Sequence, residues 1–232
     1  MARIRIDKFL ADHLNMTRSK ATEIIKKKQV TIDGVVVSNP SIIVDGEVHY
    51  LGNLIESEEY SYYILNKPKG YISARTDNLH KSVLEIINGR KDLKIVGRLD
   101  IDTTGLLIIT NDGDFIHKVT SPKSEIIKKY YVKVDKPFKR EDINLFEKGL
   151  DIKIDDTIYH TKPAKLEIID DMSGYISISE GKFHQVKKMC ASIGLEVLEL
   201  KRIQIGGLEL DSTLKEGEFK KVDISELSKI FI

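Results

Sequence analysis

Apolar residues in the first thirty positions recur at the three- and four-residue spacing of amphipathic helices. Thr17 has a side chain suited to an N-cap, and the pattern after it predicts a second helix that ends near Lys28. Further on, VTIDGVVV places an Asp33-Gly34 pair between alternating apolar residues, which predicts a hairpin. The apolar stripe of the first predicted helix consists of Ile6, Phe9, Leu10 and Leu14.

Interruptions of this apolar pattern indicate a boundary between two domains. Pro40 and Gly46 interrupt it, and the stretch GNLIESEEYSY that follows is the predicted linker. We therefore expect a small domain over residues 1–58 and a larger one over residues 59–232. About sixty residues are just enough for a domain to fold alone.

The larger segment mixes predicted strands and helices without a regular alternation of the two. Ser82 and Glu85 form a capping-box pair at the start of SVLEII, and Gly149 closes the helical pattern of REDINLFEKG. A third helical pattern, HQVKKMCASIG, stops at Gly194. This arrangement predicts an α+β fold with a mainly antiparallel mixed sheet and flanking helices. The predicted strands lie in YYILNKPKGY, LKIVGRLD, GLLIITND, KKYYVKV, KLEII, YISIS and EVLELKRIQIGGLEL.

Charge changes the picture only through its distribution, because the 232-residue chain has a formal net charge of +1. Eight Lys or Arg against three acids occupy residues 1–30, whereas residues 45–59 hold five acids and no Lys or Arg. A basic start of this kind indicates either a patch for phosphates or a solvated lysine-rich face. Charge alone favours the solvated face.

Several classes of protein are disfavoured by what the residues lack. Cys190 is the single cysteine, so no internal disulfide is expected and a reducing cytoplasm is the predicted compartment. No apolar run is long enough to span a membrane. We find no Cys and His cluster for a metal, no phosphate-binding glycine loop and no dinucleotide motif, so neither metal nor cofactor is expected.

Candidate chemistry centres on VGRLDIDTTGLLIITNDGD. Asp100 stands there in a polar loop between two apolar strands, bounded by Gly97 and Gly105. Asp100 and Asp102, two residues apart, are compatible with acid/base work, with metal binding, or with capping of backbone N–H groups in a turn. The residues alone favour the turn.

The first thirty or so residues resemble the S4 RNA-binding domain over IRIDKFLADHLNMTRSKATEIIKKKQVTIDG. Ile6 stands where members usually have Leu. Lys28 stands where they often have Gly, which removes the residue best suited to a left-handed helix end. The resemblance implies that Arg18, Lys20 and Lys27 face folded RNA, which proteins recognise mainly through shape, phosphates and 2′-hydroxyls.

The rest of the chain resembles the pseudouridine synthases that act on ribosomal RNA and carry an S4 head. The pattern GRLDxxTxGLLxxTxDG is joined by NKPKGY, KKYYV, EGKFHQVKKM and LKRIQIGGL in the family's order. The family converts uridine to its C-glycoside isomer without cofactor or metal. The resemblance makes Asp100 the nucleophile, either at C1′ of the sugar or toward a sugar proton. It assigns no role to Asp102, whose position varies in the wider family.

Two further residues take their expected roles from the same resemblance. Lys187 matches the basic residue that pairs with the family's aspartate, with Lys188 as its rival if the helix is rotated. Tyr130 matches the family tyrosine and is expected to stack on the target base after it leaves its helix. We expect an RNA groove to include Arg98, Lys67, Lys69, His184, Gln185 and Arg202.

The particular residues of several motifs indicate which ribosomal RNA is the expected substrate. HQVKKM, IDTTGLL and TKPAKLEII are most similar to the branch that modifies one uridine of 16S ribosomal RNA. Sister enzymes acting on 23S ribosomal RNA are the first alternative, and a non-catalytic ribosome-assembly factor is the second. We expect a monomer that binds 16S RNA in a pre-30S assembly intermediate and has no membrane partner.

Overall fold

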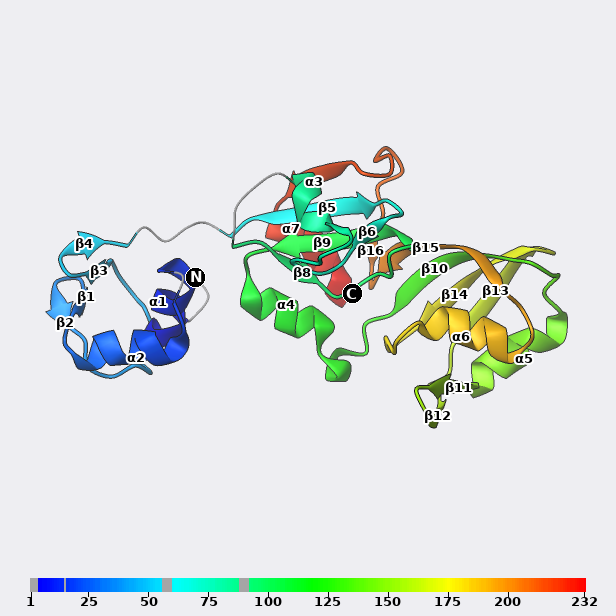
Figure 1. The fold of residues 1–232 in the computed structure, drawn as a ribbon, viewed down its shortest axis with the longest axis horizontal. Coiled ribbons are helices and arrows are strands. Elements are labelled where there is room, and N and C mark those ends of the chain that lie inside the picture. Colours follow the sequence, from blue (N-terminus) through cyan, green and yellow to red (C-terminus); the bar gives the residue numbers. More distant parts are fainter. Residues whose placement is uncertain (1–3, 15, 56–59, 88–91) are drawn as a thin grey trace. The chain divides into compact units, whose positions relative to one another are not determined.

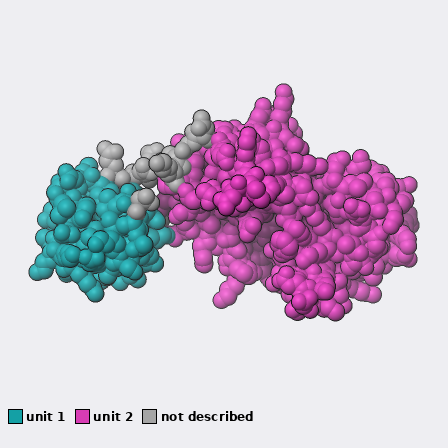
Figure 2. All heavy atoms as spheres, viewed as in Figure 1, with its two compact units in different colours: residues 1–59 teal, residues 60–232 magenta. Residues whose placement is uncertain are grey.

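The structure, a computed structural model, describes residues 4–14, 16–55, 60–87 and 92–232. It divides into two compact units, residues 1–59 and residues 60–232 (Figure 1; Figure 2). The predicted boundary near residue 58 lies outside the described residues. Part of the expected linker is strand, since β4 covers Asn53–Leu54.

The first unit packs two helices against a small antiparallel sheet with the strand order β2-β1-β3-β4. Its core contains the apolar stripes of both helices, including Ile6, Leu10, Ile24 and Ile25. The elements are α1 (Ile6–His13), α2 (Arg18–Lys26), β1 (Val30–Ile32), β2 (Val35–Val36) and β3 (Val48–Tyr50), with β4 as given above.

Local sequence signals in this unit act as predicted, with one shift. The Thr17 hydroxyl accepts a hydrogen bond from the Lys20 backbone N–H at 3.2 Å, which caps α2. The helix ends at Lys26, and Lys28 takes the left-handed conformation (φ 58°) although it is not glycine. Asp33 and Gly34, both at positive φ, join β1 to β2 in a tight hairpin.

The second unit is built on a nine-stranded sheet with the main order β13-β14-β10-β15-β9-β5-β17, joined by β8 on β9 and β16 on β15. Within this nine-stranded sheet the pairs are antiparallel except for β9 with β15, which confirms the mainly antiparallel mixed sheet. The strands are β5 (Tyr62–Lys67), β8 (Lys94–Val96), β9 (Thr104–Thr110), β10 (Lys128–Val134), β13 (Lys165–Asp170), β14 (Ser173–Ile178), β15 (Val197–Ile205), β16 (Leu208–Glu209) and β17 (Phe219–Val222). Two small ladders are β6 (Tyr71–Ile72) with β7 (Lys81–Ser82) and β11 (Asp151–Ile154) with β12 (Thr157–His160).

Helices cover this sheet, and two apolar cores separate along β9. Leu107 and Ile109 belong to one core, whereas Leu106 and Ile108 belong to the other, as alternation along a strand requires. In Figure 1, α5 lies beside β13 and α6 beside β15. The helices and short helical turns are α3 (Val83–Ile87), α4 (Gly113–Thr120), η1 (Pro122–Ser124), α5 (Arg140–Lys148), α6 (Gln185–Ser192), α7 (Ile224–Leu227) and η2 (Ser228–Phe231).

The parallel contact between β9 and β15 fixes the position of the first residues of β9, which follow the loop that contains Asp100. Thr104 pairs with Lys201 and Gly105 with Arg202. A Cβ atom on Gly105 would lie 2.2 Å from the Arg202 carbonyl oxygen, and its φ is +104°. Glycine is therefore required at this position, because a side chain would prevent the start of β9 from pairing with β15.

Candidate active site

Asp100 lies in the connection between two antiparallel neighbours, β8 and β9. We call residues 97–103 the Asp100 loop. The loop borders a pocket of about 80 Å³ that is lined from three other directions by Tyr130 of β10, Val186 of α6 and Leu200 of β15. Segments distant in sequence thus meet at one carboxylate.

A buried lysine holds the Asp100 loop from below. Lys67, at the end of β5, is 0% exposed, and its ammonium donates to the carbonyl oxygens of Thr103 at 2.8 Å, Pro68 at 3.0 Å and Ile101 at 3.3 Å. Burial lowers the pKa of Lys67 to about 8, although the carboxylates of Asp102 and Asp100 act in the opposite direction.

This placement overturns the expectation that Lys67 lines an RNA groove, because its ammonium is enclosed and its three donors are used within the chain. Other residues of the NKPKGY segment, and Ser73 just after it, also form hydrogen bonds with the Asp100 loop. The Gly70 backbone N–H donates to the Ile101 carbonyl at 2.8 Å. The buried Ser73 hydroxyl donates to the Leu99 carbonyl at 2.8 Å and accepts from the Leu99 N–H at 3.0 Å. The segment is the structural base of the Asp100 loop.

Lys187 of α6 reaches the Asp100 loop from the opposite side. Its Nζ lies 3.3 Å from Asp100 Oδ2 and 2.5 Å from Asp102 Oδ1. Lys188 points elsewhere, since its Nζ is 5.1 Å from the centroid of the Phe183 ring. The helix therefore presents Lys187, and not its rival, to the carboxylates.

Asp102 shares the Lys187 cation, which sequence reasoning did not foresee. Burial is the largest influence on the pKa of Asp102 and raises it, but the hydrogen bond and charge of Lys187 outweigh burial, so the pKa lies below its ordinary value. The contact was not predicted because the position of Asp102 varies in the family motif and was assigned no role. Nothing in the local pattern reported which carboxylate the ammonium would approach.

His184 and Gln185 begin α6 in different ways. His184 has a left-handed backbone (φ 54°), its Nε2 lies 3.5 Å from Asp100 Oδ1, and its ring stacks on Phe183 at a centroid distance of 3.8 Å. Gln185 is buried; its amide oxygen accepts from the Lys182 N–H at 2.9 Å, and its amide nitrogen donates to Glu180 at 2.8 Å. Both polar ends of Gln185 are thus engaged in shaping this turn, which does not fit the expected contact with RNA.

Tyr130 and Arg202 are cross-strand neighbours on β10 and β15. Tyr130 is 9% exposed and lines the pocket with Asp100. Arg202 is 5% exposed, and its Nε donates to the Leu106 carbonyl at 2.8 Å, so it does not lie on an open groove as expected. Arg98 and Lys69 are exposed, and Arg98 lines the pocket.

Thr103 lines the Asp100 pocket, although sequence reasoning did not select it. It is 1% exposed, and its hydroxyl has no hydrogen-bond partner within the described parts of the chain. Such a group is costly to bury unless a ligand satisfies it. The two adjacent threonines of the TTG motif gave no means of telling which one faces the pocket.

The basic residues expected to face RNA in the first unit are partly paired. Arg18 lies 2.9 Å from Asp7, and Lys20 and Lys27 lie 3.0 Å and 2.6 Å from Glu23. Their side chains remain 56%, 55% and 59% exposed. The hydrogen bond from Lys27, followed by that from Lys20, lowers the pKa of Glu23 to about 2. All three cations remain accessible to phosphates.

Neither a metal site nor a membrane-spanning helix is present among the residues that the structure describes. No group of three or more His, Cys, Asp or Glu side chains is placed to hold a metal ion there. No helix in those ranges is long and apolar enough to cross a membrane. Cys190 is a buried core residue, and burial raises the pKa of its thiol to about 12.

Comparison with known proteins identifies the family and agrees with the fold. The profile of the family described as RNA pseudouridylate synthase matches residues 61–192, and that of the S4 domain matches residues 4–48. The chain belongs to the RNA pseudouridylate synthase family and is an isomerase of RNA uridine with an S4 domain.

Relatives of known name extend the match over nearly the whole chain. It is 38% identical to ribosomal small subunit pseudouridine synthase A of Escherichia coli strain K12, over 98% of this chain and 100% of that protein. It is 37% identical to the protein of the same name from Haemophilus influenzae, over 98% and 99%. A crystal structure of a pseudouridylate synthase matches with a TM-score of 0.71 and 36% identity, over 98% and 99%.

Proposed function

We propose that this protein converts a single uridine of 16S ribosomal RNA to pseudouridine, with Asp100 as the catalytic carboxylate. One observation carries the assignment of the residue: Asp100 and Tyr130 line the same pocket, and the Lys187 ammonium lies 3.3 Å from the Asp100 carboxylate. The names of the full-length relatives support the small-subunit substrate.

The proposed reaction moves one glycosidic bond and leaves the atom count unchanged. The bond between N1 and C1′ breaks, the uracil ring turns, and C5 forms a new bond to C1′. The proton on C5 is lost and N1 gains one. Asp100 supplies the anionic oxygen in this scheme, whether it attacks C1′ or takes a proton from the sugar.

Lys187 would keep that oxygen charged in a site emptied of water. Removing a carboxylate from water is costly, and a cation in contact with it offsets the cost. In this proposal the ammonium is shared between Asp100 and Asp102, so its position is defined from two sides. Lys67 supports the loop backbone beneath both carboxylates.

Tyr130 is the proposed stacking partner of the uracil ring. The pocket of about 80 Å³ is far smaller than the roughly 300–1,000 Å³ typical of ligand sites. A nucleotide therefore enters only when side chains at its edge move. His184, which is half-buried and lines the pocket directly before α6, lies at that edge.

The S4 unit is the proposed anchor on folded RNA, through Arg18, Lys20 and Lys27. We further propose that the protein acts as a monomer in the cytoplasm on a pre-30S assembly intermediate. Comparing modification of naked 16S RNA with that of assembly intermediates tests the form of the substrate. Sedimentation of the pure protein tests the monomer.

Pseudouridine mapping tests the function. Cells that lack the protein should lose one pseudouridine in 16S RNA, and the wild-type chain should restore it whereas Asp100→Asn should not. Loss of a 23S pseudouridine instead would transfer the protein to the large-subunit sister group. Restoration by Asp100→Asn would reject Asp100 as the catalytic group.

A further inference from the structure

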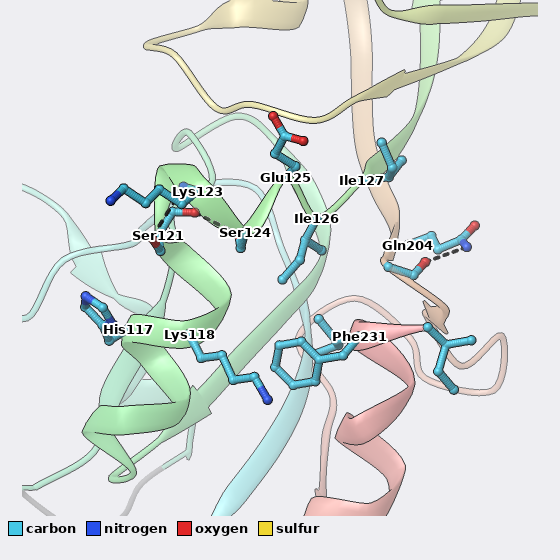
Figure 3. A pocket seen from close by; sticks show the side chains of 13 residues that line it. His117, Lys118, Ser121, Lys123, Ser124, Glu125, Ile126, Ile127, Gln204 and Phe231 are labelled. Carbon is cyan, nitrogen blue, oxygen red and sulfur yellow. Dashed lines mark hydrogen bonds between the residues drawn. The ribbon is translucent and has the colours of Figure 1, made fainter.

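A second and much larger pocket lies away from Asp100. It has a volume of about 860 Å³ and is bordered by α4, η1, the segment leading into β10, the end of β15 and η2. Figure 3 shows its side chains. Asp100, Tyr130 and Lys187 are not among its lining residues, so the reaction proposed above leaves it unexplained.

Its floor is apolar and partly open to solvent. Ile126 and Ile230 are buried, whereas Ile127 and Phe231 are 48% and 40% exposed. The edge of the Phe231 ring is held by a T-shaped contact with Phe115 at a centroid distance of 6.1 Å. Exposed apolar groups gathered in a hollow are typical of a binding surface.

Close packing of the chain builds this floor. A Cβ atom on Gly206 would lie 1.9 Å from the Ile230 carbonyl oxygen, and Gly206 has a φ of +55°. The Gly207 backbone N–H donates to the Lys229 carbonyl at 2.9 Å. The turn after β15 therefore fastens η2, and with it Phe231, to the end of the sheet.

The rim of the pocket is basic. Lys118 and Lys123 are exposed and, within the described ranges, are paired with no carboxylate. The Lys118 ammonium lies 4.1 Å from the centroid of the Phe231 ring, toward which it points in Figure 3. Glu125 is the acidic side chain of the lining, and its carboxylate is paired with Lys162 at 2.6 Å. The rim thus offers cations to a polyanion.

Two neighbouring strands link this pocket with the Asp100 pocket. Ile127, directly before β10, lines the larger pocket, and Tyr130 lines the smaller. On β15, Gln204 lines the larger pocket and Leu200 the smaller. At about 3.3 Å per residue, the two pockets are separated by roughly 10–13 Å along these strands. Two successive backbone steps of one extended RNA strand can bridge this distance, whereas one step cannot.

A further cation lies on the way between the pockets. Lys128 stands two residues before Tyr130, so both side chains leave β10 on the same face. Burial, and then the charge of Arg202, lower the pKa of Lys128, and no carboxylate of the described residues offsets them. A phosphate between the two pockets would find uncompensated positive charge there.

We propose that the pocket formed by α4, η1 and η2 binds a segment of the substrate RNA that begins two nucleotides from the target uridine, with a base on the Phe231 floor and phosphates at Lys118 and Lys123. This inference rests on the proposed function only in taking the bound RNA to be the substrate. An apolar floor with a basic rim matches a nucleotide, whose base is flat and whose backbone is anionic.

The test compares two pocket variants and one control variant on two RNAs, and Phe231→Ala is the second pocket variant. Lys118→Ala/Lys123→Ala removes the rim charge, and Lys139→Ala/Lys153→Ala removes two exposed lysines that line neither pocket. One RNA is a 16S fragment that folds around the target uridine. The other ends one nucleotide to each side of that uridine. Affinity is measured by direct binding across a range of salt concentrations, and kcat at saturating RNA.

Loss of two phosphate contacts should weaken binding of the long RNA by about tenfold and reduce its salt dependence. The short RNA and kcat should be unaffected, and the control pair should match wild type. Phe231→Ala should also weaken binding of the long RNA by about tenfold, but it should leave the salt dependence of binding unchanged because no charge is removed. Because the Phe231 ring is partly exposed, we expect its removal to leave the protein folded, and thermal unfolding of the variant checks this.

Unchanged affinity for the long RNA in both pocket variants would overturn the proposal and leave the surface to a partner other than RNA. An equal loss of affinity for the long and the short RNA would also overturn the proposal, because the defect would then lie at the target nucleotide. Binding is read without catalysis, so these outcomes are independent of whether Asp100→Asn is inactive.

Discussion

Lys187 Nζ lies 2.5 Å from Asp102 Oδ1, closer than the 3.3 Å that separates it from Asp100. The residue proposed to sustain the catalytic carboxylate is therefore held mainly by a different carboxylate. Asp102, at 61% side-chain exposure, is the more accessible of the two acids. This relationship gives Asp102 a positioning role that can be separated from the chemical role of Asp100.

Asp102→Asn should lower kcat by roughly tenfold with little change in KM, because a charge-assisted hydrogen bond that orients Lys187 is lost. Asp100→Asn should lower kcat by at least about a thousand-fold while RNA affinity stays within several-fold. Single-turnover isomerisation rates and direct binding distinguish the two. Asp156→Asn, a fully exposed acid, is the control. Equal losses in both variants would contradict the separation of roles.

Thr103→Val should leave the free energy of unfolding unchanged or slightly raised, because the Thr103 hydroxyl is buried without a partner in the described structure. The same change should lower kcat/KM by about tenfold if substrate RNA supplies the missing hydrogen bond. Denaturant unfolding and steady-state kinetics provide the two readings. Destabilisation together with normal kinetics would show that the hydroxyl serves the fold.

Tyr130→Leu should lower kcat/KM by about 5- to 150-fold, since loss of base stacking costs roughly 1–3 kcal/mol. Tyr131→Leu is the matched control, because Tyr131 points to the other face of β10 and contacts Tyr175 edge to face. Kinetics on the same RNA fragment provide the measurement. Similar losses in the two variants would indicate a general defect of the strand.

Lys67 should titrate near pH 8, which can be followed by NMR of its side-chain nitrogen. Its folded pKa lies below the unfolded value of 10.5, so between these values the unfolded chain binds more protons and stability rises with pH. Below about pH 8 the penalty of burying the ammonium is present in full, on the order of 3 kcal/mol.

The Lys67→Met variant lacks this titration. The free energy of unfolding of wild type relative to Lys67→Met should therefore increase from pH 8 to pH 10.5, as measured by denaturant unfolding at each pH. A difference that does not change with pH would contradict a depressed pKa for Lys67. If the variant does not fold, the NMR titration of wild type decides the point by itself.

Deleting residues 1–58 should weaken RNA binding and reduce its salt dependence more than it affects the fold of the remainder. The reason is that the exposed cations Arg18, Lys20 and Lys27 are removed with the S4 unit. Binding at several salt concentrations and thermal unfolding of the truncated chain measure both effects. Equal affinity and equal salt dependence would remove the anchoring role from this unit.

Local signals determined most of the secondary structure. Thr17, the Asp33-Gly34 pair and the Ser82–Glu85 pair act through hydrogen bonds and backbone preferences among near neighbours, so the sequence is sufficient to find them. The motif around Asp100 also identified the family, and the fold is the mainly antiparallel α+β arrangement that was predicted. The assignment of Asp100 itself remains a prediction.

Only the tertiary structure decided where the charged side chains go. In the sequence Lys67 is one more lysine beside a proline, yet packing of β5 against the Asp100 loop encloses it and turns it to three carbonyl oxygens. The Lys187–Asp102 contact joins residues 85 positions apart, and the pocket beside Phe231 joins three separate stretches of the chain, within residues 117–127, 204–206 and 230–232. Burial and charge pairing depend on such long-range contacts, which no local pattern records.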